Sequence, residues 1–224
     1  MRHLSRRARK RPARELRSEN MGRVSDAKER LMEAVLELIW TGSYGSTTID
    51  LICEKAAVKK GSFYYFFDSK CELAAAALDA DWERRRPELD ALFSPTIPGL
   101  ERLRKFCEFG YKKQLGLKEK YGSVLGCPLY ALGSEICTQE HKLQAKVQQI
   151  LAQHKKYVES AIRDAQAENS IRVSDPAEKA RTIQAYYEGL LTQARIQNDM
   201  EILKEAPRGI FSILGVKETE LTPA

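Results

Sequence analysis

A short basic and aromatic segment holds the side chains of this 224-residue sequence with the most evident chemistry. It reads KKGSFYYFF and places Lys59 and Lys60 ahead of a glycine, a serine and five consecutive aromatic rings. On a helix, successive side chains are about 100° apart. Phe63, Phe66 and Phe67 therefore share one face, which predicts that these three rings pack into a core.

The remaining side chains of this segment face the other way and are suited to binding an anion. Tyr64 and Tyr65 fall on the outer arc, and tyrosine is common where one end of a ring is dry and the other is wet. The amides at a helix N-terminus are unpaired, and the helix dipole favours negative charge there. With Ser62 contributing a hydroxyl and Gly61 allowing close approach, the segment predicts a phosphate-binding surface.

The elements around the segment have the order of a helix-turn-helix unit. Apolar spacing predicts a helix at about residues 26–41, a short helix at about 48–55, a turn at 57–58, and a second short helix at about 60–67. Two short helices joined by a tight turn are typical of this motif. Its second helix places N-terminal residues in the major groove of DNA.

The rest of the chain is also predicted to be helical. Apolar residues recur at helical spacing, and no segment alternates with a period of two, so we expect an all-α fold of nine helices. Pro87 is expected to bend or end the helix in which it lies. The six further helices are expected at about residues 69–93, 99–117, 128–137, 141–167, 176–198 and 200–214.

Charge divides the chain unevenly, although its net charge is only +6. Residues 1–24 carry nine basic and two acidic side chains, so the rest is close to neutral. We interpret 1–24 as a disordered basic arm for a polyanion, followed by a DNA-binding domain at 25–70, a second helical domain at 71–218, and a tail at 219–224. The alternatives for the arm are a solvated tail, or a chain that starts at Met21.

Other classes of function find little support. The sequence has no HExxH, GxSxG or P-loop motif, so no catalytic residue is expected. With only three histidines, and with Cys137 and His141 better explained by a helix end, we expect no metal and no cofactor. Five cysteines without a CxxC pair, no apolar stretch of membrane-spanning length and no secretory h-region predict a cytoplasmic protein with free thiols and no membrane contact.

The segment from Ser46 to Leu73, STTIDLICEKAAVKKGSFYYFFDSKCEL, resembles the tetracycline-repressor (TetR) family of bacterial transcription regulators. A second stretch, GCPLYALGSEI, is similar to one found in a branch of that family. Two positions depart from the pattern: Ala57 replaces the usual turn glycine, and Phe66 stands where His or Tyr is frequent. The resemblance implies that double-stranded DNA is contacted by Thr47, Thr48, Lys59, Lys60, Gly61, Ser62, Tyr64, Tyr65 and Lys70.

The resemblance also implies how the protein would act. A homodimer would bind a palindromic operator, most often as a repressor, and a small-molecule effector would release it. The effector pocket would be lined by Trp82, Phe106, Phe109, Tyr111, Leu129, Tyr130 and Glu135. The dimer interface would include Ala185, Gly189, Ile210 and Phe211. Two alternatives stay open: a redox sensor acting through Cys107, Cys127 or Cys137, and a DNA-binding module whose C-terminal domain docks a protein partner.

Overall fold

The structure is a computed structural model that describes the backbone of residues 13–136 and 139–216, and the side chains from residue 26 onward within those ranges. The described part contains nine α-helices, one 3-10 helix and no strand, which confirms the all-α prediction. None of its helices has the length and apolar character of a membrane span. The helices are α1 (Ala13–Thr41), α2 (Ile49–Lys55), α3 (Lys60–Phe66), α4 (Lys70–Leu92), α5 (Gly99–Tyr121), α6 (Pro128–Ile136), α7 (His141–Ala167), α8 (Pro176–Gln197), η1 (Glu201–Glu205) and α9 (Ala206–Ile213).

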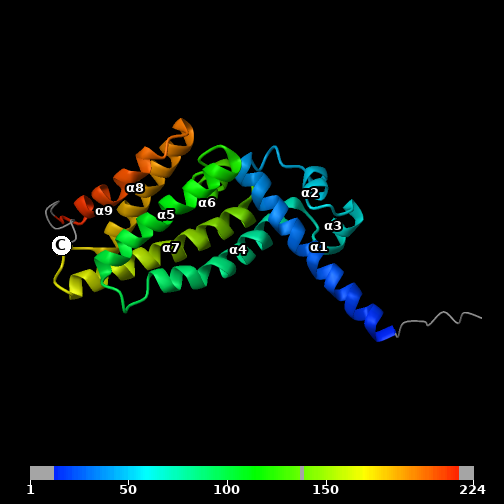
Figure 1. The fold of residues 1–224 in the computed structure, drawn as a ribbon, viewed down its shortest axis with the longest axis horizontal. Helices are drawn as coiled ribbons and strands as arrows, with labels where there is room; N and C mark the ends of the chain where they lie inside the picture. The colour runs from blue at the N-terminus through cyan, green and yellow to red at the C-terminus, as the bar shows by residue number, and fades with distance from the viewer. Residues whose placement is uncertain (1–12, 137–138, 217–224) are drawn as a thin grey trace, which may run out of the picture.

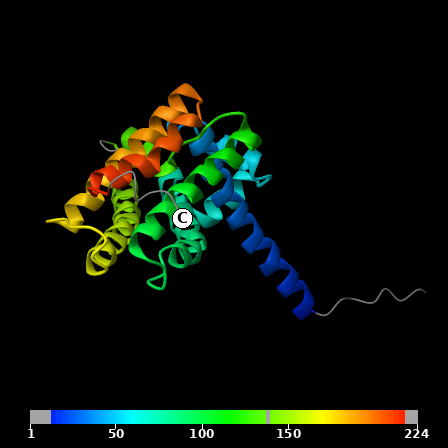
Figure 2. The same ribbon diagram turned by 60° about the vertical axis from the view of Figure 1, so that its left-hand side comes forward.

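The helices form an elongated molecule with α2 and α3 at one end (Figure 1). These two short helices pack against α1, which also contacts α4 and α6. Helix α7 is central in the larger part, because it contacts α4, α5, α6 and α8. The pair α8 and α9 lies along the side of the larger part, away from α3 (Figure 2).

The core around α1, α2 and α3 is continuous with the larger helical part. One buried cluster joins Leu31 of α1 and Phe63 of α3 to Leu73 of α4, Leu132 of α6 and Leu143 of α7. A second cluster fills the space between α5, α7, α8 and α9. One apolar cluster therefore contains residues of α1 and α3 together with residues of α4, α6 and α7. Packing, as well as the covalent link, fixes α1, α2 and α3 to the rest of the chain.

Several helix starts follow directly from side-chain capping. Ser69 accepts the backbone N–H of Glu72 at 3.1 Å and starts α4. Asp175 accepts the N–H groups of Ala177 and Glu178 at 2.9 and 3.0 Å, and Pro176 follows it at the first helical position of α8. Both caps satisfy amides that a helix leaves unpaired, and both were expected from the sequence.

Three boundaries differ from the predicted ones. Helix α1 begins at Ala13, inside the segment predicted to be a disordered arm, and residues 1–12 lie outside the described part. Helix α4 continues through Pro87, which is exposed, so water can bind the carbonyl that this proline leaves unpaired. Helix α5 runs four residues further than expected and ends at Gly122, whose φ of 76° provides a left-handed cap.

Candidate nucleic-acid interface and ligand cavity

Helix α3 divides its aromatic residues between core and surface as the spacing predicted. Phe63 is fully buried and Phe67 nearly so, whereas Tyr64 and Tyr65 are 52% and 75% exposed. Tyr64 packs edge-on against Phe63, with 5.2 Å between the ring centroids. Tyr65 packs edge-on against Phe66, which is only partly buried although the spacing predicted it in the core. The two phenols are therefore held by neighbouring phenylalanines and present their hydroxyls to solvent.

Cationic side chains border these phenols at the start of α3. Lys59 is the exposed N-cap residue, and the Lys60 ammonium lies 2.7 Å from a carboxylate oxygen of Asp50 on α2. This hydrogen bond raises the pKa of Lys60. Both partners are more than half exposed, so the pair contributes little to stability and can be exchanged for another anion. Around Gly61 nothing lies within 4 Å of where a Cβ would stand, which leaves this position open to a close approach.

The turn between α2 and α3 keeps the left-handed geometry that glycine usually provides. Ala57 has φ = 51°, its N–H donates to Glu54 at 3.0 Å, and the N–H of Val58 donates to Cys53 at 2.9 Å. This pair of bonds is a Schellman motif, in which the left-handed residue is usually glycine. From α1, Arg30 donates to the Ala56 carbonyl at 2.9 Å and holds the turn in place.

The loop between α1 and α2 is fastened to the larger helical part through Tyr44. Glu135 of α6 accepts the N–H groups of Tyr44 and Gly45 at 2.8 and 2.6 Å. Lys70, at the start of α4, donates to the carbonyls of Tyr44 and Thr47 at 2.7 and 2.8 Å. These bonds tie the segment before α2 to both α4 and α6.

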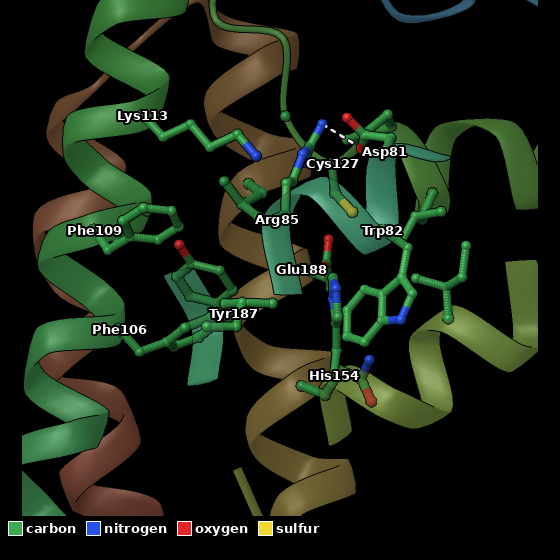
Figure 3. A pocket seen from close by; sticks show the side chains of 18 of the residues that line it. Asp81, Trp82, Arg85, Phe106, Phe109, Lys113, Cys127, His154, Tyr187 and Glu188 are labelled. Carbon is green, nitrogen blue, oxygen red and sulfur yellow. Dashed lines mark ion pairs between the residues drawn. The ribbon is translucent and has the colours of Figure 1, made fainter. Parts of the chain in front are cut away.

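A cavity of about 160 Å³ lies between α1, α4, α5, α6, α7 and α8 (Figure 3). Its walls are mostly aromatic and aliphatic. They include four of the seven predicted residues, Trp82, Phe106, Phe109 and Leu129. The sequence did not predict further lining residues on α1, α4, α5, α7 and α8, of which Trp40, Arg85, Lys113, His154, Tyr187 and Glu188 matter most below.

Two cations meet at one side of the cavity. Lys113 of α5 and Arg85 of α4 both lie over the Trp40 ring, at 5.6 and 5.8 Å from its centroid. Burial, followed by the neighbouring charge of Arg85, lowers the pKa of Lys113 to about 8. Arg85 forms an ion pair with Asp81 at 2.6 Å, whereas Lys113 has no hydrogen bond or ion pair with any described residue.

Two further titratable groups line the cavity, and burial shifts the pKa of each toward its neutral form. Burial raises the pKa of Glu188 to about 7, and the Cys127 thiol hydrogen bonds to this carboxyl group. The other carboxyl oxygen, Oε2, is buried without a hydrogen-bond partner. Burial lowers the pKa of His154 to about 4, so its imidazole is neutral at pH 7.

Comparison with known proteins assigns both ends of the chain to one family. Residues 31–77 match the model of the bacterial regulatory proteins of the tetR family, and residues 99–210 match a tetracyclin repressor-like C-terminal domain. The chain belongs to the TetR family. It is a helix-turn-helix transcriptional regulator, and members of this family bind DNA, typically form dimers and are not enzymes.

Individual TetR-family relatives match over most of their length. The transcriptional regulator AcuR of Cereibacter sphaeroides is 27% identical over 76% of this chain and 77% of its own. The repressor NemR of Escherichia coli K12 is 22% identical over 84% of this chain and 94% of its own. A crystal structure of a TetR regulatory protein from Rhodobacter sphaeroides superposes with a TM-score of 0.74 at 25% identity, covering 84% of this chain and 98% of the other.

Within this TetR fold, three predicted DNA contacts have other partners. Thr47 is buried, and its hydroxyl donates to the Ser43 carbonyl at 2.7 Å. The ammonium of Lys70 is taken up by the loop carbonyls and lies 4.0 Å from the centroid of the Tyr44 ring. The polar atoms of these two side chains are therefore used within the protein. Thr48 is exposed and caps α2 by accepting the Leu51 N–H at 3.2 Å.

Three predicted pocket residues do not line the cavity. Glu135 lies beyond it, on the loop amides described above. Tyr111 follows the cavity residue Gly110 on α5, so it points about 100° away and packs with the core between α5 and α9. Tyr130 is only partly buried and also lies outside the lining. Four of the seven predicted residues line the cavity, and the helix face of a residue decides whether it does so.

The described cysteines have no setting that would activate a thiol. Burial raises the pKa of Cys53 and Cys71, and it raises the pKa of Cys107 and Cys127 to about 12. A reactive thiol needs the opposite shift, because the thiolate is the nucleophile. The redox hypothesis therefore gains no support from these four residues, and Cys137 lies outside the described part.

The predicted dimer residues separate into two groups. Ile210 and Phe211 are buried inside their own protomer, so their side chains are not available to a second chain, contrary to prediction. Ala185 is exposed on α8, and nothing lies within 4 Å of where a Gly189 Cβ would stand. On the same helix Ile196 is 77% exposed, so α8 presents a face of small and apolar groups.

Proposed function

We propose that this TetR-family regulator is a homodimeric repressor that binds a palindromic operator and leaves it when a small molecule enters the cavity. The observation that carries the proposal is the exposed face of α3. There the exposed Tyr64 and Tyr65 pack against Phe63 and Phe66 and lie beside two solvent-accessible lysines. The E. coli relative NemR is a transcriptional repressor, which supports repression as the sign of regulation.

DNA contact would come from the start of α3 and its outer face. The aromatic hydroxyls can donate to phosphates or base edges, and the ammonium groups supply the charge that phosphates require. Gly61 permits the backbone to approach closely, and Ser62 adds a hydroxyl. Thr47 and Lys70 are left out of this surface because their side chains are used within the protein.

A dimer would form through α8 and the neighbouring α9. The small side chains at 185 and 189 allow close helix approach, and the exposed Ile196 supplies apolar area on the same helix. Two chains related by a two-fold axis present two α3 helices to successive major grooves, about 34 Å apart. This symmetry is the reason for expecting a palindromic operator.

Release from DNA would use α4 and α6, the two helices that connect the cavity with α2 and α3. Helix α4 starts directly after α3 and lines the cavity with Trp82 and Arg85. Helix α6 lines it with Leu129 and Leu132, and its Glu135 holds the loop before α2. A ligand that fits best with these helices displaced would shift the population away from the DNA-binding arrangement.

In vitro selection of operator sequences by the purified full chain tests the proposal. We expect enrichment of a palindrome whose half-sites lie about one helical turn apart, bound by two chains. Enrichment of no sequence, or binding by a single chain to a non-palindromic site, would contradict it. We also propose that the protein acts in the cytoplasm, where the chromosome lies.

A further inference from the structure

The cavity holds a cation that lies over the Trp40 ring and has no ion-pair partner among the described residues. The Lys113 ammonium is in an aromatic cavity and forms no ion pair with a described residue, which is costly for a desolvated charge. Lysine in a structural role usually extends its ammonium to water. A lysine kept in this position is expected where a bound molecule supplies the missing negative charge.

The nearby carboxylate does not neutralise this lysine. Asp81 has one oxygen 2.6 Å from Arg84 and the other 2.6 Å from Arg85, so both oxygens are taken by guanidinium groups. Glu88 also borders the cavity, but it is exposed to solvent. Lys113 therefore has no carboxylate of its own, and Figure 3 shows its ammonium directed toward Arg85, whose guanidinium is paired with Asp81.

The rest of the cavity sets the size and nature of the ligand. An apolar protein cavity of about 150 Å³ can hold one benzene molecule. The present cavity, of about 160 Å³, has walls built by Trp82, Phe106, Phe109 and Tyr187, which suit a flat apolar body. Glu188 adds a buried oxygen, Oε2, that has no hydrogen-bond partner.

We propose that the effector is a small monocarboxylate with an apolar body about the size of one aromatic ring, its carboxylate paired with Lys113 and Arg85. The inference rests on the proposed function, because it names the ligand class of the same regulator. When protonated, Glu188 can donate its hydrogen to the carboxylate from α8. A bound anion thus links α4, α5 and α8 across the cavity.

Direct titration of the full chain without DNA tests this ligand class. The probe is benzoate, with neutral benzamide and cationic benzylammonium as matched molecules of nearly the same shape. We expect benzoate to bind at least about tenfold more tightly than either, because a charge-assisted hydrogen bond in a buried site is the largest polar contribution available. Equal binding of benzamide, tighter binding of benzylammonium, or no benzoate binding by the folded protein would overturn the proposal.

Variants of two neighbouring lysines show whether the charge acts where we place it. Lys113→Met should weaken benzoate binding by about 10- to 100-fold, and Lys113→Arg should retain most of it. Lys112→Met removes the same charge from an exposed position on the same helix and should change nothing. Unaltered benzoate affinity in Lys113→Met would overturn the assignment.

The pH dependence of benzoate affinity provides a second readout. The titratable and charged groups facing the site are Asp81, Arg85 and Glu88 of α4, Lys113 of α5, Cys127 directly before α6, His154 and Tyr157 of α7, and Tyr187 and Glu188 of α8. Between pH 6 and pH 9, Glu188 becomes charged and Lys113 loses its proton. Both changes disfavour an anion, so affinity should fall over this range. A flat profile would contradict the proposed pairing.

Failure of this inference can be told from failure of the proposed function. Operator selection needs no ligand, and benzoate titration needs no DNA. Operator binding without benzoate binding would reject the ligand class and leave the regulator in place. Benzoate binding without operator binding would reject the DNA-binding function and leave the cavity assignment standing.

Discussion

The outer face of α3 and the cavity are built from the same kinds of side chain, aromatic rings and ammonium groups, in opposite settings. At α3 the rings of Tyr64 and Tyr65 face solvent, and Lys60 is paired with Asp50 in water. In the cavity the rings face inward, and Lys113 is partly buried over the Trp40 ring without an ion pair to a described residue. The hydrogen bond to the Asp50 carboxylate raises the pKa of Lys60, whereas burial lowers the pKa of Lys113 to about 8.

The difference shows how exposure decides what a cation can bind. A solvated ion pair contributes little energy, so a polyanion with many phosphates can replace the carboxylate at little expense. A desolvated cation is unfavourable when alone, so one small anion can gain much from pairing with it. Each of the following variants affects one of these regions, or the connection between them.

The largest expected effect is the loss of DNA binding in Lys60→Ala combined with Tyr64→Ala. The double variant removes one ammonium group and one phenol from the outer face of α3, each of which can supply a phosphate or base contact. We expect operator affinity to fall by about 100-fold or more in a gel-shift titration. Benzoate binding and the dimer should be unchanged, since neither residue approaches the cavity or α8.

The control for charge is Lys112→Ala, which removes an exposed ammonium group from α5. Its operator affinity should remain within about twofold of wild type, because Lys112 is exposed far from α3 along the sequence and on another helix. Retained DNA binding in the α3 variant would reject the assignment of this face. A similar loss in both variants would mean that net charge alone governs binding.

The next largest effect is on stability and concerns the cavity lysine. In the unfolded chain Lys113 has its usual pKa of 10.5, and burial lowers it to about 8 in the folded protein. Below pH 8 both states hold the proton, and the folded state bears the full penalty. As pH rises from 8 to 10.5 the folded state loses its proton first, so the unfolded state binds more protons and this contribution to stability increases with pH.

Lys113→Met should therefore raise the free energy of unfolding at pH 7 by about 2 kcal/mol, while weakening benzoate binding. Urea denaturation of the wild type and the variant at pH 7 and pH 10 measures this, and the difference between the two proteins should shrink at the higher pH. Lys112→Met, at an exposed position, should leave the free energy unchanged. A destabilised Lys113→Met would show that the ammonium has a favourable partner, which would remove the contrast with Lys60.

A smaller effect is expected at the link between the two regions. Glu135→Ala removes the carboxylate that accepts the N–H groups of Tyr44 and Gly45. Because this carboxylate is largely exposed, we expect a loss of about 1 kcal/mol in stability. The more specific readout is the ratio of operator affinities with and without benzoate, which should fall by about fivefold if α6 transmits occupancy to α2.

Glu119→Ala, which removes an exposed glutamate from α5, is the control for that experiment. It should leave both the stability and the affinity ratio unchanged. If the ratio is also unchanged in Glu135→Ala, then α4 alone connects the cavity with α3.

The helix-turn-helix segment was more predictable from the sequence than the cavity, for a physical reason. Residues 46–73 lie close together in sequence and act through local structure: the spacing of Phe63, Tyr64 and Tyr65 on one short helix fixed which rings would be exposed. The helix starts at Ser69 and Asp175 were likewise predictable, since a cap depends on residues within three positions.

The cavity depends on contacts between helices that are distant in sequence. Lys113, Glu188 and Trp40 come from α5, α8 and α1, and no local pattern indicates that they face one space. The same limit explains Glu135, whose partners lie about ninety positions away, and Lys70, whose ammonium turns to the loop carbonyls instead of outward. For both side chains, the partner lies too far away in the sequence for a local pattern to indicate it.

The smallest expected effect concerns Ala57, where the sequence departs from the family pattern and the backbone does not. Its φ of 51° is costly for a residue with a Cβ, by about 1 kcal/mol, because the Cβ approaches the following carbonyl oxygen. Ala57→Gly removes this strain, but glycine also gains freedom in the unfolded chain, so we expect a net gain of about 0.5 kcal/mol in unfolding free energy. Ala152→Gly, at an exposed right-handed position inside α7, should lose about 1 kcal/mol instead. Opposite signs of the change in unfolding free energy, measured by urea denaturation, would establish the strain as a property of the turn.

The same variant, Ala57→Gly, should leave operator affinity unchanged. The backbone bonds from Ala57 to Glu54 and from Val58 to Cys53 persist in it, so the turn keeps its geometry. A loss of operator affinity would mean that the outer face of α3 depends on the stiffness that alanine gives the turn. The cavity, which is built from long helices, has no such requirement.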